Sequence, residues 1–311
     1  MAQRVDEHLV EVGREEFVNA WGRGLCIRWR ALRSHPAPPR LQPDAGRALD
    51  ERLDLVRGVG PKTAERLRRE GYRRLAELSR HPRYGREATR LWAALAQRDV
   101  SRLLAAGARD VELLGMFGRD EVAVVDIETA GLWQVLPLFL VGCAFRSDSG
   151  WEVRQYFARS FDEEAAVLHE VSRELAGRSV CVTYNGKAFD EPFVRARLAL
   201  HGLPPVRFRL HVDMLHACRR WYGSLLPDCR LATVGAHLFA LEREDDIPGA
   251  AVPDTYYQYV RDGDDALVAP LLRHNALDLY ALACLTELAW AAQPEERDAG
   301  TGAALGPGWA G

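Results

Sequence analysis

The 311-residue sequence predicts an α/β fold, with a mixed five-stranded sheet flanked by helices and preceded by a small all-α domain. Two observations support this prediction. After residue 118, short apolar runs bounded by turn residues alternate with amphipathic stretches of helical period, which is the pattern of an α/β protein. Between residues 51 and 117 the pattern is helical throughout.

The length suits one large and one small domain, since domains commonly hold roughly 100–200 residues. Residues 1–50 open with a weak helical pattern and then become a Pro-rich linker, S-H-P-A-P-P-R. We expect the helical domain at 51–117, the α/β domain at 118–292 and a disordered Gly- and Ala-rich tail at 293–311.

Composition indicates a soluble, cytoplasmic protein. Hydrophobic residues make up 48% and charged residues 27% of the chain, and no apolar run reaches the ~20 residues of a membrane span. The first residues lack the basic-then-apolar pattern of a signal peptide. The six cysteines form no C-x-x-C pair, so we expect small core residues rather than a zinc site or disulfides.

Charge is distributed unevenly along the chain. Residues 57–102 contain thirteen Lys or Arg and five acidic residues, a balance of +8, which leaves −11 for the rest of a chain whose total is −3. A basic module on an acidic body indicates that the first binds a polyanion and the second binds cations.

The α/β domain is predicted element by element from its apolar runs. A buried strand begins at Glu121, and four more strands follow, with helices between the third, fourth and fifth strands and after the last. The strands are expected at 136–145, 151–157, 180–184 and 206–213, and the helices at 161–175, 190–201 and, with an irregular acidic interruption, 214–288.

In the helical domain, the turn Gly58-Val59-Gly60 lies between an apolar helix end and a helix that Pro61 opens and Gly71 ends. Such a turn exposes backbone N–H groups at a helix N-terminus, where phosphate binds. The segment resembles the helix-hairpin-helix motif of DNA-binding and repair proteins.

That resemblance implies backbone contacts from Gly58 and Gly60, to which Lys62, Arg66 and Arg69 would add salt-dependent affinity. The alternative is a packing hairpin whose arginines form a solvated face.

The α/β domain opens with V-A-V-V-D-I-E-T-A at 122–130. Because side chains alternate along a strand, Asp126 and Glu128 point to the same face near its end. Two adjacent carboxylates call for a cation, and oxygen ligands suit Mg²⁺ or Mn²⁺. The alternative is a solvated strand end or a cap.

Two further segments carry an acid after an apolar run. They are T-Y-N-G-K-A-F-D-E-P-F with Asp190 and R-H-N-A-L-D-L-Y-A-L with Asp278. With the D-x-E, they resemble the three motifs of DEDD-superfamily 3′–5′ exonucleases over residues 118–290. The likeness extends to the exonuclease domain of family B DNA polymerases and to YprB-type proteins, and it implies a ribonuclease H-like fold.

By this resemblance, four acids would hold two metal ions that stabilise the attacking and leaving oxygens of a phosphodiester. Asp126 would bridge both ions, Glu128 and Asp278 would help hold one, and Asp190 would hold the other through water. In the superfamily the general base is a Tyr four residues or a His five residues before the last Asp. Here His274 lies four before it, where an unperturbed imidazole can accept a proton at neutral pH. An ordinary helix histidine is the alternative.

Three neighbouring residues are candidates for nucleic-acid contact. Thr129 resembles the position that contacts the terminal nucleotide, Asn185 contacts substrate or shapes its turn, and Lys187 contacts a phosphate or is a solvated loop lysine.

We therefore expect a Mg²⁺- or Mn²⁺-dependent nuclease, a 3′–5′ exonuclease with a backbone-gripping module and DNA or RNA as partner. A structure-specific endonuclease on the same fold and a non-catalytic nucleic-acid-binding protein are the alternatives. DNA versus RNA, strandedness and oligomeric state stay open.

Overall fold

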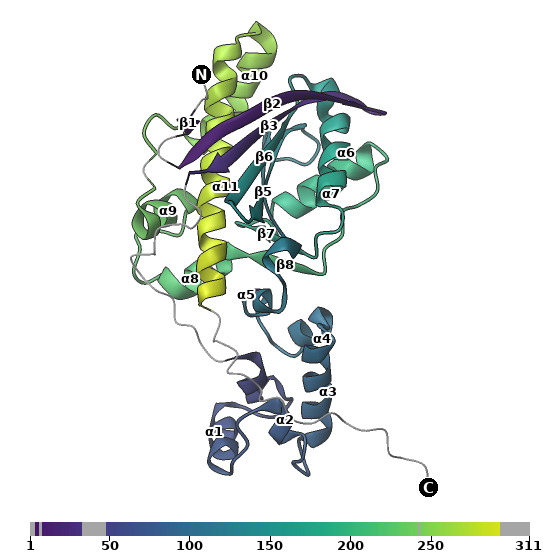
Figure 1. The fold of residues 1–311 in the computed structure, drawn as a ribbon, viewed down its shortest axis with the longest axis vertical. Coiled ribbons are helices and arrows are strands. Elements are labelled where there is room, and N and C mark those ends of the chain that lie inside the picture. Colours follow the sequence, from purple (N-terminus) through teal and green to yellow (C-terminus); the bar gives the residue numbers. More distant parts are fainter. Residues whose placement is uncertain (1–3, 6–7, 33–47, 242, 293–311) are drawn as a thin grey trace.

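The computed structural model describes residues 4–5, 8–32, 48–241 and 243–292, which form an α/β body with a group of short helices at one end (Figure 1). One sheet runs through the body in the order β1-β2-β3-β6-β5-β4-β7-β8. Its strands are β1 (Arg4–Val5), β2 (Leu9–Asn19), β3 (Gly22–Ala31), β4 (Val122–Thr129), β5 (Leu138–Ser147), β6 (Gly150–Phe157), β7 (Val180–Thr183) and β8 (Leu210–Asp213).

The strand β4 lies inside the sheet and is buried where the sequence is apolar. Residues 122–125 are all buried, as expected of a strand covered on both faces. β4 pairs in parallel with β7 and antiparallel with β5, and β7 pairs in parallel with β8. The sheet is therefore mixed, as predicted.

The predicted strand count is wrong, because three strands precede the five expected ones. Residues 9–21, whose pattern predicted a weak helix, instead form β2 and the turn of a β-hairpin. Gly22, the residue after this turn, has a φ of +130°. β3 pairs with β6 and buries Ile27 and Trp29. β2 is half exposed and rich in charge, so its apolar residues show no clean alternation, and pairing with β3 decides its conformation. The Pro-rich linker and the tail at 293–311 lie outside the described residues.

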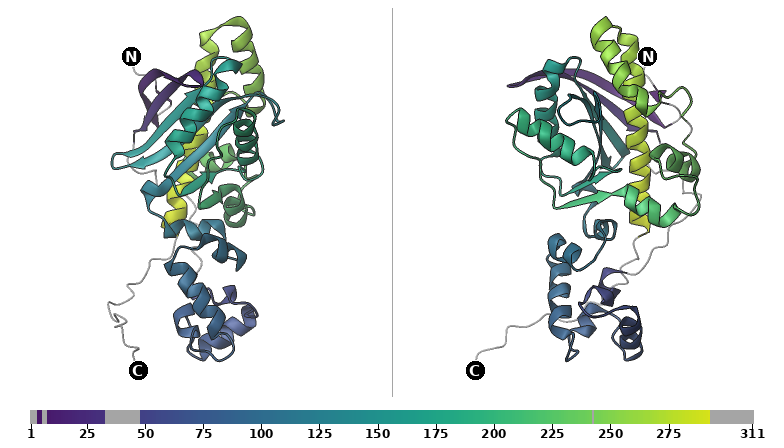
Figure 2. Two further views of the ribbon diagram at one scale, coloured as in Figure 1. Left: turned by 90° about the vertical axis from the view of Figure 1, so that its right-hand side faces the viewer. Right: turned by 180° about the vertical axis from the view of Figure 1, so that it is seen from behind.

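Helices cover the two faces of the sheet, and Figures 1 and 2 place α11 on one face and α6 and α7 on the other. The helices of this body are α6 (Glu164–Leu175), α7 (Asp190–Leu200), α8 (Met214–Tyr222), α9 (Leu231–Phe239), α10 (Val252–Asp262) and α11 (Val268–Ala291).

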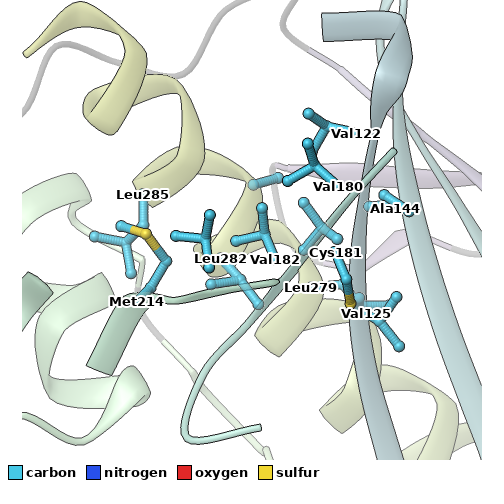
Figure 3. Packing of buried hydrophobic residues seen from close by; sticks show 14 of the residues in the cluster. Val122, Val125, Ala144, Val180, Cys181, Val182, Met214, Leu279, Leu282 and Leu285 are labelled. Atoms are coloured by element: carbon cyan, nitrogen blue, oxygen red, sulfur yellow. The ribbon is translucent and has the colours of Figure 1, made fainter. Parts of the chain in front are cut away.

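The helix α11 is fixed to the sheet by apolar packing. Figure 3 shows Leu279 and Leu282 of α11 near Val182 of the sheet, and Leu285 of α11 beside Met214 of α8. All five side chains are fully buried, and each such burial contributes about 1.5–3 kcal/mol. This packing determines which α11 residues face the end of β4.

Residues 49–121 form short helices, in agreement with the helical pattern there. They are η1 (Leu49–Glu51), η2 (Leu53–Leu55), α1 (Pro61–Arg69), α2 (Leu75–Leu78), α3 (Gly85–Ala96), α4 (Val100–Ala105), α5 (Asp110–Leu113), η3 (Leu114–Met116) and η4 (Arg119–Glu121). The body has further single turns at η5 (Phe161–Glu163), η6 (Gly249–Ala251) and η7 (Asp265–Leu267).

The turn around Gly58 differs in part from the expected hairpin of helices. α1 begins at Pro61 and buries Ala64 and Leu67, as its pattern predicts, but the element before the turn is only the single 3₁₀ turn η2. Gly58 adopts a φ of +86°, which favours glycine and ends any helix before it.

The helical group contacts the body through α5, which packs against β8. Among the described residues, no helix is both long enough and apolar enough to cross a membrane.

Candidate active site

The first two acids lie where β4 ends. The register with β5 shifts between Glu128 and Thr129, where Phe139 of β5 is the extra, unpaired residue, and such irregularities are common beside functional sites. Asp126 and Glu128 are partly exposed, and both interact with residues of α11. The expected shared face of the D-x-E therefore faces α11.

Asp190, the first residue of α7, joins the same strand end. Its carboxylate accepts a hydrogen bond from the backbone N–H of Ile127, the residue between the two β4 acids. Asp213 holds the loop before α7, because its carboxylate accepts from the backbone N–H groups of Asn185, at 2.8 Å, and Lys187, at 3.2 Å. Asp213 also caps α8.

The acids raise one another's pKa. Burial and the charges of Asp278, Glu128 and Asp190 raise the pKa of Asp126 well above its usual range. Burial also raises the pKa of Glu128 to about 8, with His274 opposing and Asp278 adding to the shift. The pKa of Asp190 rises to about 7, chiefly through burial. The structure thus brings together four acids from three separated segments.

Cationic side chains face this cluster. Arg243 pairs with Asp278 and, at 3.2 Å, with Asp246. The Nδ1 of His274 lies 3.1 Å from Asp246, and its Nε2 lies 3.8 Å from Asp278. One helical turn separates His274 and Asp278, as their spacing predicts.

The ionisation of His274 differs from the unperturbed imidazole that we expected. Burial alone would lower its pKa, but the bond to Asp246 and the charges of Asp278 and Glu128 outweigh burial and raise the pKa to about 9. The free side chain is therefore protonated at neutral pH. Cations bound to Asp278 and Glu128 would offset the charges of these two carboxylates and so lower the pKa of His274, while the bond to Asp246 would remain.

Sequence reasoning missed three residues of the site. Arg243 and Asp246 belong to the irregular acidic interruption, which matches no motif. Asn275 donates from Nδ2 to the Oδ2 of Asp126 at 2.8 Å. Its position between His274 and Asp278 on α11 was the one available signal.

Four oxygen donors at a partly open strand end fit Mg²⁺ or Mn²⁺ in chemistry. Within the described ranges, however, no three His, Cys, Asp or Glu side chains already form a coordination cluster. Two of the four acids already have other partners, because Arg243 pairs with Asp278 and Asn275 donates to Asp126. Arg243 would have to release Asp278 for that carboxylate to bind a metal ion.

The three candidate contacts around the acids have internal partners. Thr129 is buried and donates to the carbonyl of Gly131 at 2.7 Å. Asn185 shapes its turn at a φ of +64°. The Nζ of Lys187 lies 2.5 Å from Asp110 of α5, so this lysine is ion-paired rather than free.

The residues of the glycine turn lie elsewhere. Figures 1 and 2 show α1 at the end of the helical group away from the sheet, so the structure does not bring Gly58, Gly60 and Lys62 to the acids. Arg66 and Arg69 are exposed, and they pair with Glu70, the C-cap of α1, at 3.7 Å and with Glu65 of α1 at 3.3 Å.

A mixed sheet with acids at the end of an inner strand has the form of a ribonuclease H-like fold. Residues 123–290 match the model of the RNase H superfamily, and the chain belongs to this superfamily. Its members are typically nucleases that use divalent metals, so membership suggests a nuclease activity.

The chain is similar to the uncharacterized protein YprB of Bacillus subtilis (strain 168), with 30% identity over 173 residues. The match covers 54% of this chain and 42% of YprB, so the chain matches less than half the length of that relative. Among solved structures, it is similar to the family B DNA polymerase of the archaeon Pyrobaculum calidifontis, with a TM-score of 0.44 and 20% identity over 53% of this chain and 24% of the polymerase.

Proposed function

We propose that this protein is a divalent-metal-dependent nuclease that cleaves nucleic acid from the 3′ end by a two-metal mechanism. The observation that carries this proposal is the meeting of Asp126, Glu128, Asp190 and Asp278 at one strand end. Closely spaced carboxylates that raise one another's pKa are costly to a fold and typical of functional sites.

In this proposal the carboxylates of Asp126, Glu128, Asp190 and Asp278 would hold the two ions, with Asp126 as the central ligand. Two bound Mg²⁺ or Mn²⁺ ions would supply charge stabilisation for the attacking and leaving oxygens of the phosphodiester. Asn275 orients the carboxylate of Asp126 through its Oδ2, and the Oδ1 of Asp126 would then bind metal.

His274 is the proposed base that removes the proton of the attacking water. The carboxylate of Asp246 accepts a hydrogen bond from Nδ1–H, with the two heavy atoms 3.1 Å apart, which leaves Nε2 on the side of Asp278 and the acids. The pairing thus selects the tautomer in which Nε2 can accept a proton once the surrounding carboxylates are neutralised.

The helical group is proposed to hold the nucleic-acid backbone. Its glycine turn precedes the N-terminus of α1, and Lys62, Arg66 and Arg69 are exposed beside it. Such contacts add affinity without reading bases.

End-labelled single- and double-stranded DNA and RNA, incubated with the protein and Mg²⁺ or Mn²⁺, test the proposal. We expect a ladder that shortens from the 3′ end, and Asp126→Asn should slow it at least about 100-fold, because a shared ligand affects both ions. Asp162→Asn, which neutralises an exposed acid, is the matched control and should cleave normally.

The other outcomes are equally informative. Internal fragments would favour an endonuclease on this fold. Absence of cleavage with every substrate and both metals would overturn the nuclease proposal in favour of a binding protein.

A further inference from the structure

A chain of buried polar side chains crosses the core behind Asp126. The indole Nε1 of Trp29 on β3 donates to the Oε1 of Gln155 on β6 at 2.6 Å. The Nε2 of Gln155 donates to the Oδ1 of Asn275 at 2.8 Å and to the carbonyl of Leu272 at 2.8 Å. Asn275 then donates to Asp126. We call these three residues, Trp29, Gln155 and Asn275, the polar relay.

The polar relay has a fixed direction. An indole nitrogen can only donate, so Gln155 must present its oxygen to Trp29 and its NH₂ group to Asn275. Asn275 must then present its oxygen to Gln155, which directs its NH₂ group at Asp126. The donor-only indole of Trp29 and the acceptor-only carbonyl of Leu272 therefore both fix the orientation of the Gln155 amide, and Gln155 in turn fixes that of Asn275.

The core is built to keep this arrangement. Gln155 and Asn275 are 0% exposed and Trp29 is 2% exposed, so a broken link would leave a buried polar group unpaired. Gly142, which lies opposite Asp126 on β5, leaves space for the side chain of Asn275, because a Cβ at this position would lie 2.2 Å from the Oδ1 of Asn275.

We propose that Asn275 is a positioning residue for the metal ligand Asp126, and that Trp29 orients it through Gln155. The N-terminal hairpin, which lies outside the superfamily match at 123–290, is then part of the active-site structure. Figure 1 shows why this is feasible, since β3 lies beside β6 in the same sheet. This inference rests on the proposed metal site.

Mn²⁺ binding to the full chain, measured by electron paramagnetic resonance, tests the inference. Asn275→Ala should weaken Mn²⁺ binding about 10–100-fold, as loss of a residue that orients a metal ligand commonly does. Trp29→Phe leaves Asn275 in place and removes the orienting donor, so we expect a smaller loss, on the order of threefold. The double variant should bind no more weakly than Asn275→Ala, because both act through one route.

The matched control is Tyr256→Phe, which removes another fully buried donor, the hydroxyl bonded to the carbonyl of Ala158 at 2.9 Å. Thermal unfolding of all variants separates lost stability from lost metal affinity. A second readout is the indole N–H resonance of Trp29, identified by its absence in Trp29→Phe. It should shift when Mg²⁺ is added to the wild type and stay unchanged in Asn275→Ala.

The outcomes separate the two proposals. A wild type that binds neither ion overturns the metal site and, with it, this inference. The positioning role alone is overturned if folded Asn275→Ala binds Mn²⁺ as tightly as the wild type. It is also overturned if Trp29→Phe and Tyr256→Phe lose the same amount of Mn²⁺ affinity.

Discussion

The acids at the end of β4 hold their protons more tightly in the folded chain than in an unfolded one. The pKa of Glu128 rises from 4.5 to about 8, and that of Asp190 from 3.8 to about 7. A raised carboxyl pKa stabilises the fold below the unfolded pKa, and this stability is lost as pH rises through the folded pKa. His274, raised from 6.5 to about 9, acts in the same direction.

Without metal, the melting temperature should therefore fall between about pH 4.5 and 9. In Glu128→Gln that fall should be smaller by roughly a few degrees, since ~1 kcal/mol corresponds to a few degrees in a domain of this size. Scanning calorimetry in EDTA provides the measurement. Mg²⁺ should raise the melting temperature more at pH 8 than at pH 5, because a cation favours ionised carboxylates. If the melting temperatures of the wild type and Glu128→Gln changed with pH in parallel, the raised pKa of Glu128 would be contradicted.

Among the elements, the contact between α5 and the loop before α7 determines how Asp190 is held. Asp110 of α5 is buried and accepts from the Nζ of Lys187 and, at 3.1 Å, from the backbone N–H of Asp213. Burial would raise the pKa of Asp110, but these donors outweigh burial and lower it. Lys187, for which we expected either a phosphate contact or a solvated loop position, thus links the helical group to the body.

Asp110→Ala should lower the free energy of unfolding by about 2–3 kcal/mol, because it leaves buried donors unpaired. Lys187→Ala should cost less, about 1 kcal/mol, since this side chain is 38% exposed and solvent screens its charge. Urea unfolding measures both. A Lys187→Ala variant of unchanged stability that binds nucleic acid more weakly would instead support the phosphate contact.

The elements also show how far sequence patterns reach. β4, β7 and α7 follow from their apolar period, and the D-x-E and the His274 to Asp278 spacing determine shared faces. The polar relay does not follow from any pattern, because its bonds join residues 120 to 149 positions apart. Such contacts depend on which strands become neighbours, and the conformation of β2 and β3 depends on that same pairing.

Over the whole molecule, the basic stretch and the four site acids lie in different parts of the structure. The basic stretch at 57–102 belongs to the helical group, which lies at one end of the ribbon in Figure 1, while the four site acids belong to the α/β body. A nucleic acid that contacted both would be held by its backbone at one end and cleaved at the other. Binding and cleavage should therefore be separable by mutation.

Charge reversal of Lys62 and Arg66 to Glu tests this separation. Each lost phosphate contact should reduce the slope of log affinity against log salt by about 0.9 on double-stranded DNA, or about 0.7 on single strands, so the double variant should lose roughly 1–2 units. The control reverses Arg173 and Arg261, two exposed arginines of the body that change the net charge equally. Salt titrations by fluorescence anisotropy should show the reduced slope only in the first variant, with its cleavage rate at saturating substrate unchanged. Equal slopes in both variants would mean that net charge, rather than the glycine turn and α1, holds the backbone.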